Sequence, residues 1–195
     1  MASISLKYKS KSGNLTAPGD VDPGAMIPLA TTTVGAGGTS TITFSSIPQN
    51  YEHLQLRLLS RSEGVDYGII LKLNSDAGSN YYRHYLFADG STVVSGGDAS
   101  AFSGALFLYA AASNGTANAY STNIVDVLDY TNTNKYKTMR NLNGVDFNGS
   151  GFVSLSSALW NSTAAVNSIT LTIYGGHDFA QYTHAALYGI KRAGA

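Results

Sequence analysis

The sequence NSITLTIYGGHDFAQYTHAALYGI, residues 167–190, indicates the fold class of this chain. Apolar residues alternate with polar or mixed ones over residues 169–174, and the period of two returns over residues 186–190 after a Gly175-Gly176 break. Alternation of this kind predicts two half-buried β-strands. A strand so late in the chain must lie beside strands made earlier, so we expect an all-β sandwich or barrel that its C-terminal strand completes.

The same period of two recurs along the rest of the chain. It is clearest at residues 54–58, 69–73 and 81–87, and the spacers between such segments are rich in Gly, Asn, Ser and Thr, which favour turns. Turn signals recur about every 8 to 12 residues, which is typical of a sandwich rather than of alternating strands and helices. Further strands are expected over residues 29–34, 40–44, 102–112, 119–130, 135–145 and 151–160. We therefore predict an all-β fold, an antiparallel β-sandwich that is jelly-roll-like and has about ten strands.

The charge of the chain is low and balanced. Charged residues make up 12% of the 195 residues, with 12 basic and 12 acidic side chains. A neutral chain is not steered to nucleic acid or to anionic membrane, so we expect neither as a partner. The absence of Cys excludes disulfides, Cys-based zinc sites and thiol nucleophiles. The N-terminus has no apolar run of signal-peptide length, and we expect synthesis in the cytoplasm without export by a signal peptide.

Residues 1–28 differ from the remainder and predict an extended N-terminal arm. Lysines alternate with other residues over 7–11, and three of the four prolines lie in residues 13–28. Such an arm either stays disordered in the isolated chain or orders on a partner. The residues expected to contact that partner are Lys7, Tyr8, Lys9, Lys11, Leu15, Val21, Met26 and Ile27. Residues 29–195 are expected to form a single β-sandwich domain.

Residues suited to catalysis or metal binding are few and scattered. None of the four histidines lies in an i, i+4 pair on a helical pattern or in a nucleophile motif, so we interpret them as packing or surface residues. The loop NSDAGSN, residues 74–80, lacks the Glu that completes a calcium loop, and we interpret it as a turn closed by Asx hydrogen bonds. We predict no catalytic residue, no metal, no cofactor and no enzymatic activity.

The most ligand-like segment is YYRHY, residues 81–85. Aromatic rings, an Arg and a His can stack on sugars, whereas the alternative is a strand with aromatic cross-strand pairs. The possible glycan contacts are Tyr82, Arg83, His84 and His177.

Several segments of strand and turn carry a resemblance that covers most of the chain. They are SIPQNYEHLQLRLLSRS (46–62), LKLNSDAGSNYYRHYL (71–86), DYTNTNKYKTMRNLNG (129–144), GSGFVSLSSALWNSTAAVNSITLTI (149–173) and FAQYTHAALYGIK (179–191). In these segments the chain resembles a module of virion structural proteins of tailed bacteriophages, including phages of cyanobacteria. The resemblance implies a jelly-roll domain located on the virion, usually as a homo-oligomer, with a trimer favoured. It does not distinguish the head from the tail.

Three functions are considered in the light of that resemblance. A tail fibre normally has a long trimeric shaft with repeats, which this chain lacks, whereas a capsid cement protein needs a compact body and an arm. Our first hypothesis is a capsid decoration or cement protein that binds and stabilises the head shell through residues 1–28, with the major capsid protein or other virion proteins as partner. The second is a tail-fibre, baseplate or receptor-binding module that recognises host surface glycans. A polysaccharide hydrolase is the third.

Overall fold

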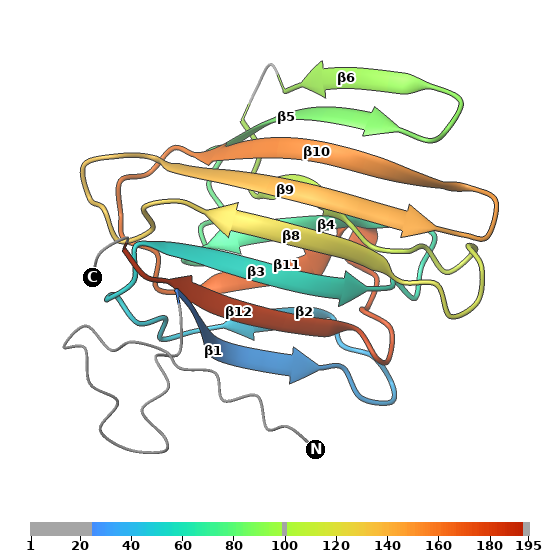
Figure 1. The fold of residues 1–195 in the computed structure, drawn as a ribbon, viewed down its shortest axis with the longest axis horizontal. Helices are drawn as coiled ribbons and strands as arrows, with labels where there is room; N and C mark the ends of the chain where they lie inside the picture. The colour runs from blue at the N-terminus through green and yellow to red at the C-terminus, as the bar shows by residue number, and fades with distance from the viewer. Residues whose placement is uncertain (1–24, 99–100, 193–195) are drawn as a thin grey trace, which may run out of the picture.

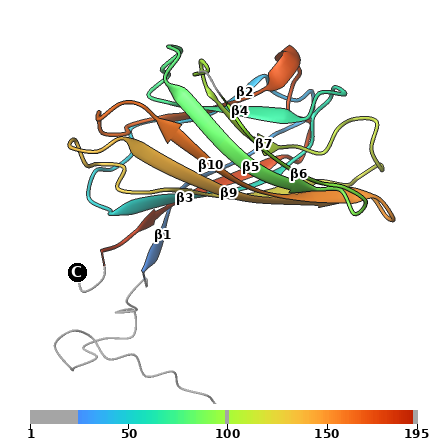
Figure 2. The same ribbon diagram turned by 90° about the horizontal axis from the view of Figure 1, so that it is seen from above.

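The computed structural model describes residues 25–98 and 101–192, which form two antiparallel β-sheets packed face to face (Figures 1 and 2). The strands are β1 (Met26–Thr33), β2 (Thr41–Phe44), β3 (His53–Ser60), β4 (Gly68–Leu73), β5 (Tyr81–Ala88), β6 (Val93–Gly97), β7 (Ala105–Tyr109), β8 (Ser121–Val127), β9 (Lys137–Asp146), β10 (Gly151–Trp160), β11 (Ile169–Ile173) and β12 (His184–Ile190). A single 3-10 turn, η1 (Tyr174–Gly176), precedes β12. In this part of the chain no helix is long and apolar enough to cross a bilayer.

The strand order is that of a jelly roll with two inserted hairpins. The larger sheet has the order β1-β12-β3-β8-β9-β10-β5-β6 and the smaller sheet the order β2-β11-β4-β7. Strands β1-β12-β3-β8 and β2-β11-β4-β7 are the two four-stranded halves of a jelly roll. The hairpins β5-β6 and β9-β10 extend the larger sheet beyond β8. The predicted all-β, jelly-roll-like sandwich is therefore confirmed.

The described part of the chain contains twelve strands, more than the predicted ten or so. The unexpected strand is β6, whose sequence VVSGG has no alternation of apolar and polar residues. It forms by pairing with β5, from Ala88↔Val93 to His84↔Gly97. Its pairing is therefore set by the preceding strand and not by a pattern of its own.

Strand β1 begins at Met26, before the predicted start of the domain at residue 29. Pro28 removes a backbone donor, but β1 lies at the edge of the sheet and its register shifts between Pro28 and Ala30. Both circumstances allow a proline within a strand. Met26 and Ile27 accordingly pair with Ile190 and Gly189 of β12. The other predicted arm contacts, which lie outside the described residues, are Lys7, Tyr8, Lys9, Lys11, Leu15 and Val21.

The apolar core lies between the sheets. Leu54 and Leu56 of β3 are fully buried, as are Leu71 of β4 and Ile169 and Leu171 of β11. These are the alternate positions predicted to face inward. Full burial of one such side chain contributes about 1.5–3 kcal/mol, so this alternation holds the two sheets together.

Farther along the larger sheet the inner face includes a patch of buried polar residues. Asn123 of β8 and Asn141 and Asn143 of β9 are buried, and their side chains hydrogen-bond to backbone atoms of β7. Strand β7 is the edge of the smaller sheet, so one side of its backbone has no neighbouring strand. The asparagines therefore provide hydrogen-bond partners for backbone groups of this edge strand that would otherwise lack them.

Candidate functional site

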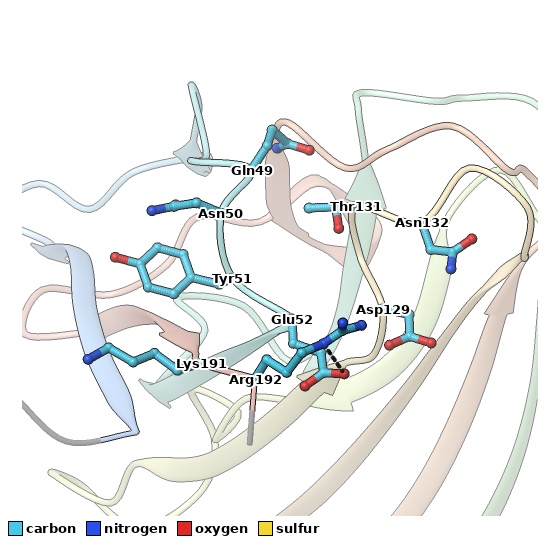
Figure 3. Close-up of a pocket in the computed structure, with 9 residues that line it drawn as sticks. All are labelled: Gln49, Asn50, Tyr51, Glu52, Asp129, Thr131, Asn132, Lys191 and Arg192. Carbon is cyan, nitrogen blue, oxygen red and sulfur yellow. Dashed lines mark ion pairs between the residues drawn. The ribbon is translucent and has the colours of Figure 1, made fainter. Parts of the chain in front are cut away.

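Three loops distant in sequence meet at one end of the sandwich, at the left in Figure 1. Strand β3 is antiparallel to both β12 and β8, so its start lies beside their ends: His53 pairs with Ile190, and Leu54 with Val127. The loops at this end enclose an open pocket of about 620 Å³ (Figure 3). The lining residues are Gln49, Asn50, Tyr51, Glu52, Asp129, Thr131, Asn132, Lys191 and Arg192.

Two buried side chains hold the β8–β9 turn that forms one wall of the pocket. The ring of Tyr130 is fully buried, and its hydroxyl donates a hydrogen bond to the carbonyl of Pro48 in the opposite loop. Lys137 is also buried, and its Nζ donates to the carbonyls of Asn132 at 2.6 Å, Lys135 at 2.9 Å and Thr163 at 3.1 Å. Burial lowers the pKa of Lys137. The turn is thus fixed from within, and Asn132 keeps a defined position at the pocket wall.

The opposite wall depends on close contact between Tyr51 and β12. A Cβ atom added to Gly189 would lie 2.5 Å from Cγ of Tyr51. Glycine at 189 therefore lets the aromatic ring rest directly on the strand. Gln49 is fixed as well, because its amide donates to the carbonyls of Ile47 at 2.8 Å and Val166 at 2.9 Å. The pocket is therefore lined by groups whose positions are set by the fold.

The charges at the pocket are paired with one another. Nζ of Lys135 lies 2.6 Å from Oδ2 of Asp129, and this hydrogen bond is the main cause that holds the pKa of Asp129 below its ordinary value. Nδ1 of His53 accepts the backbone N–H of Asp129 at 3.0 Å and lies 3.5 Å from Oδ1 of the same residue. Arg192 lies 3.5 Å from Glu52, as the dashed line in Figure 3 marks.

This pairing argues against a metal ion at the pocket. Donor atoms of Glu52, His53 and Asp129 lie within 4.8 Å of one another. However, the nearest His53 nitrogen already accepts an N–H, Lys135 neutralises Asp129, and Arg192 neutralises Glu52. A metal ion would have to displace the side chains of Lys135 and Arg192 from two of its three ligands. The donor set fits hydrogen-bonding ligands better, because the wall also offers amide groups and the Tyr51 ring.

The predicted glycan contacts are not gathered on one surface. Arg83 lies on the opposite face of β5 from Tyr82 and His84, because side chains alternate along a strand. Its guanidinium faces the sandwich, with Nε 3.1 Å from Asp98, a hydrogen bond to the carbonyl of Leu106 and the Tyr85 ring 5.2 Å away. His177 lies after η1 and contacts Asp66 at 3.2 Å, in the loop between β3 and β4.

The loop over residues 74–80 is the predicted Asx turn. Oδ1 of Asp76 accepts the N–H of Gly78 at 2.8 Å, and Oδ2 accepts the indole N–H of Trp160 at 2.7 Å. A second bond to Oδ2 comes from Nδ2 of Asn80 at 2.8 Å. The oxygens that resembled calcium ligands therefore hold the loop to β10.

Residues of the pocket were not predicted as a site. The only local signal is the Asp- and Asn-rich turn DYTNTN, residues 129–134, which alone predicts no more than a turn. Comparison with family models and with curated proteins produced no match to this chain. Fold and site therefore define the protein as a jelly-roll β-sandwich with a polar pocket at one end of its larger sheet.

Proposed function

We propose that this chain is a bacteriophage virion structural protein that decorates and stabilises the capsid, anchored by its N-terminal segment. The jelly-roll body is compatible with this role, and the sequence resemblance described above suggests it. Fold alone does not determine function. The proposal therefore depends on where the N-terminal segment joins the body.

The observation that carries the proposal is a contact between the two ends of the described chain. The N–H of Lys191 donates to the carbonyl of Ala25 at 2.9 Å, and Met26 pairs with Ile190. Residue 25 thus lies at the end of the sandwich that holds the pocket, since Lys191 is one of the lining residues. In this role, the arm and the pocket end would face the capsid together, while the rest of the body projects outward.

The polar character of the pocket end suits contact with an assembled shell. Its charges are paired locally, and its amides offer both donors and acceptors. Protein interfaces are commonly polar at the rim and include bridging water. Such a surface sets the orientation of the body on the shell, while an arm that carries three lysines and several apolar residues supplies affinity by ordering on the shell.

The test compares two chains on capsids that lack this protein. In one variant residues 1–24 are replaced by a flexible Gly/Ser segment of equal length, and the other is the unaltered chain. We expect the same melting temperature for both bodies, with capsid binding lost only in the variant. Gold-labelled antibody against the body should mark virion heads. Undiminished binding by the variant, or label confined to the tail, would overturn the proposal.

A second function is favoured by the pocket itself. Amide side chains and an aromatic ring, Asn50, Asn132 and Tyr51, are the groups with which proteins bind uncharged sugars. In a receptor-binding module this pocket, rather than the dispersed residues near β5, would contact host glycans. Binding to host polysaccharide that is abolished by Asn132→Ala and retained by Asn134→Ala would support this function. Equal binding by the two variants would exclude the pocket as the glycan site.

A further inference from the structure

The outer face of the larger sheet, turned to the viewer in Figure 1, carries an unusual row of aliphatic residues. Ile124 of β8 pairs with Leu142 of β9, Leu142 pairs with Leu155 of β10, and Leu155 pairs with Leu86 of β5. We name these four residues the outer ladder. Their exposed fractions are 40%, 53%, 50% and 48% in that order. Four neighbouring strands thus present aliphatic side chains to solvent in direct register.

Polar residues are buried beneath the middle of this row. Leu142 of β9 lies between buried Asn141 and Asn143, and Ile124 of β8 lies between buried Asn123 and buried Val125. Leu155 of β10 likewise lies between buried Ser154 and Ser156. A sheet with one solvated face places polar residues outward and apolar residues inward. At Leu142 and Leu155 this arrangement is reversed, which makes the outer ladder a candidate for burial against a partner.

The apolar surface extends beyond the ladder. Val153 is 52% exposed and lies on the same face of β10 as Leu155. At the other end a shallow, largely apolar groove of about 260 Å³ is lined in part by Leu59 and Ile124. Contiguous exposed apolar surface of this kind marks interaction sites rather than ordinary solvated surface.

The charged groups beside the ladder are satisfied within the same face. Arg140 lies 2.7 Å from Asp126, which also accepts a hydrogen bond from Gln55 at 2.9 Å. Arg57 donates to Gln55 at 3.0 Å and stacks over the ring of Tyr188, 5.5 Å from its centroid. A partner therefore contacts an apolar strip whose neighbouring charged side chains are already paired within this chain. This suits an equally apolar, uncharged surface better than a charged one.

We propose that the outer ladder is the interface of a face-to-face homodimer, covered by the same ladder of a second copy. An isologous contact requires a self-complementary surface, and a row of aliphatic side chains satisfies that requirement with either direction of packing. A twofold axis along the ladder, in the plane of contact, lays the row on its own copy with each residue facing itself. Leu142 of one copy then faces Leu142 of the other.

The available area is close to what a stable dimer needs. Five strands from β3 to β5 at a spacing of about 4.8 Å, over about seven residues of 3.3 Å, give a flat projection of roughly 550 Å². Protruding side chains raise the accessible area above this value, towards the roughly 800 Å² per partner of a standard interface. Two such sheets would pack about 10 Å apart, like the layers of one sandwich.

This inference does not rest on the capsid role. It also differs from the trimer implied by the sequence resemblance, because a face-to-face contact joins two copies and not three. Solution mass decides between them. Sedimentation of the full chain at micromolar concentration should give twice the 20.5 kDa mass of one copy. Leu142→Asp should shift the chain to monomer, with a dissociation constant raised by about 100-fold or more because two charges are buried per dimer.

The matched control is Val65→Asp, in the loop between β3 and β4. Val65 is 60% exposed, but it lies outside the larger sheet, and its substitution should leave the dimer intact. Circular dichroism checks that both variants are folded. A wild-type chain that stays monomeric overturns the proposal, as does an oligomer that Leu142→Asp does not change. Capsid binding by a monomer that requires the ladder would assign the face to the shell instead, and would also overturn it.

A second measurement tests the geometry directly. Because the chain has no cysteine, Leu142→Cys introduces a single thiol. A short bifunctional thiol reagent should link two copies through that thiol, since packed sheets lie about 10 Å apart. Val65→Cys should give no linked dimer. Equal cross-linking of the two variants would show that the ladder is not at the interface.

Discussion

The side chain of Asn123 pairs with the backbone of Tyr109 as a neighbouring strand would. Its Oδ1 accepts the N–H of Tyr109 at 3.2 Å, and its Nδ2 donates to the carbonyl of Tyr109 at 2.9 Å. Asn123 belongs to the larger sheet and Tyr109 to the edge strand of the smaller one. One amide therefore joins the two layers at the point where the smaller sheet ends.

This arrangement predicts a large effect of Asn123→Ala on stability. The substitution removes both bonds and leaves partly buried backbone groups of Tyr109 without their Asn123 partner, which costs about 2–4 kcal/mol of unfolding free energy. Urea denaturation followed by circular dichroism measures the loss. Asn134→Ala, at an exposed position, should change stability by less than about 0.5 kcal/mol. Similar losses for the two variants would contradict the structural role of Asn123.

The contact between Asp76 and Trp160 predicts a response to acid. The indole hydrogen bond is the main cause that holds the pKa of Asp76 below its ordinary 3.8. Since the folded-state pKa lies below the unfolded-state value, the carboxylate stabilises the fold above pH 3.8, and this contribution is lost as the pH falls through the folded-state pKa.

The only tryptophan of the chain reports this titration. Trp160 emission should shift with a midpoint below pH 3.8, while circular dichroism remains native. In Asp76→Asn the shift should be absent, because no carboxylate titrates beside the indole. A shift that persists in Asp76→Asn would assign the response to another group.

Gly189→Ala should disturb the pocket by displacing Tyr51. The added methyl group would lie 2.5 Å from Cγ of Tyr51, so the ring or the strand must move, at a cost of about 1–3 kcal/mol. Gly35→Ala is the matched control, because nothing lies within 4 Å of its added Cβ. Thermal unfolding of both variants provides the comparison. A melting temperature for Gly189→Ala equal to that of Gly35→Ala would show that Tyr51 does not pack as described.

Arg61 is predicted to control the loop between β7 and β8. Its guanidinium donates to four carbonyls of that loop, those of Ser113, Gly115, Thr116 and Ala119, at 2.9–3.3 Å. Lysine offers one ammonium in place of the planar fork and cannot reach all four. Arg61→Lys should therefore cost about 1–2 kcal/mol and speed amide hydrogen exchange in residues 113–119. Arg140→Lys, on the exposed outer face, should leave that exchange unchanged.

The strands were predictable where one face of the sequence is consistently apolar. Leu54, Leu56 and Leu71 alternate with polar residues, and all three face the core as expected. Prediction was weaker at β6, whose adjacent valines and glycines carry no period, and at Met26, because Pro28 disguised the start of an edge strand. In these places the pairing partner, and not the local sequence, determines the strand.

The pocket was not predictable from local patterns. Asn50, Asp129 and Arg192 come together only because β12, β3 and β8 are neighbours in the larger sheet. Strand order is a property of the whole chain, and the three loops share no motif. For the aromatic segment over residues 81–85, the local sequence predicted one cluster of side chains. Strand alternation instead divides these side chains between the two faces of β5.

The pairing of the first described strand with the last has a consequence for synthesis. Thr31 bonds to His184, 153 residues later in the chain. At a translation rate of about 5–20 residues per second, β1 waits roughly 8–30 s on the ribosome before its partner has been made. One edge of strand β3 also stays unpaired until β12 has been made. The nascent chain therefore carries unpaired strand edges for many seconds, and its yield in cells should depend on chaperones that bind such edges.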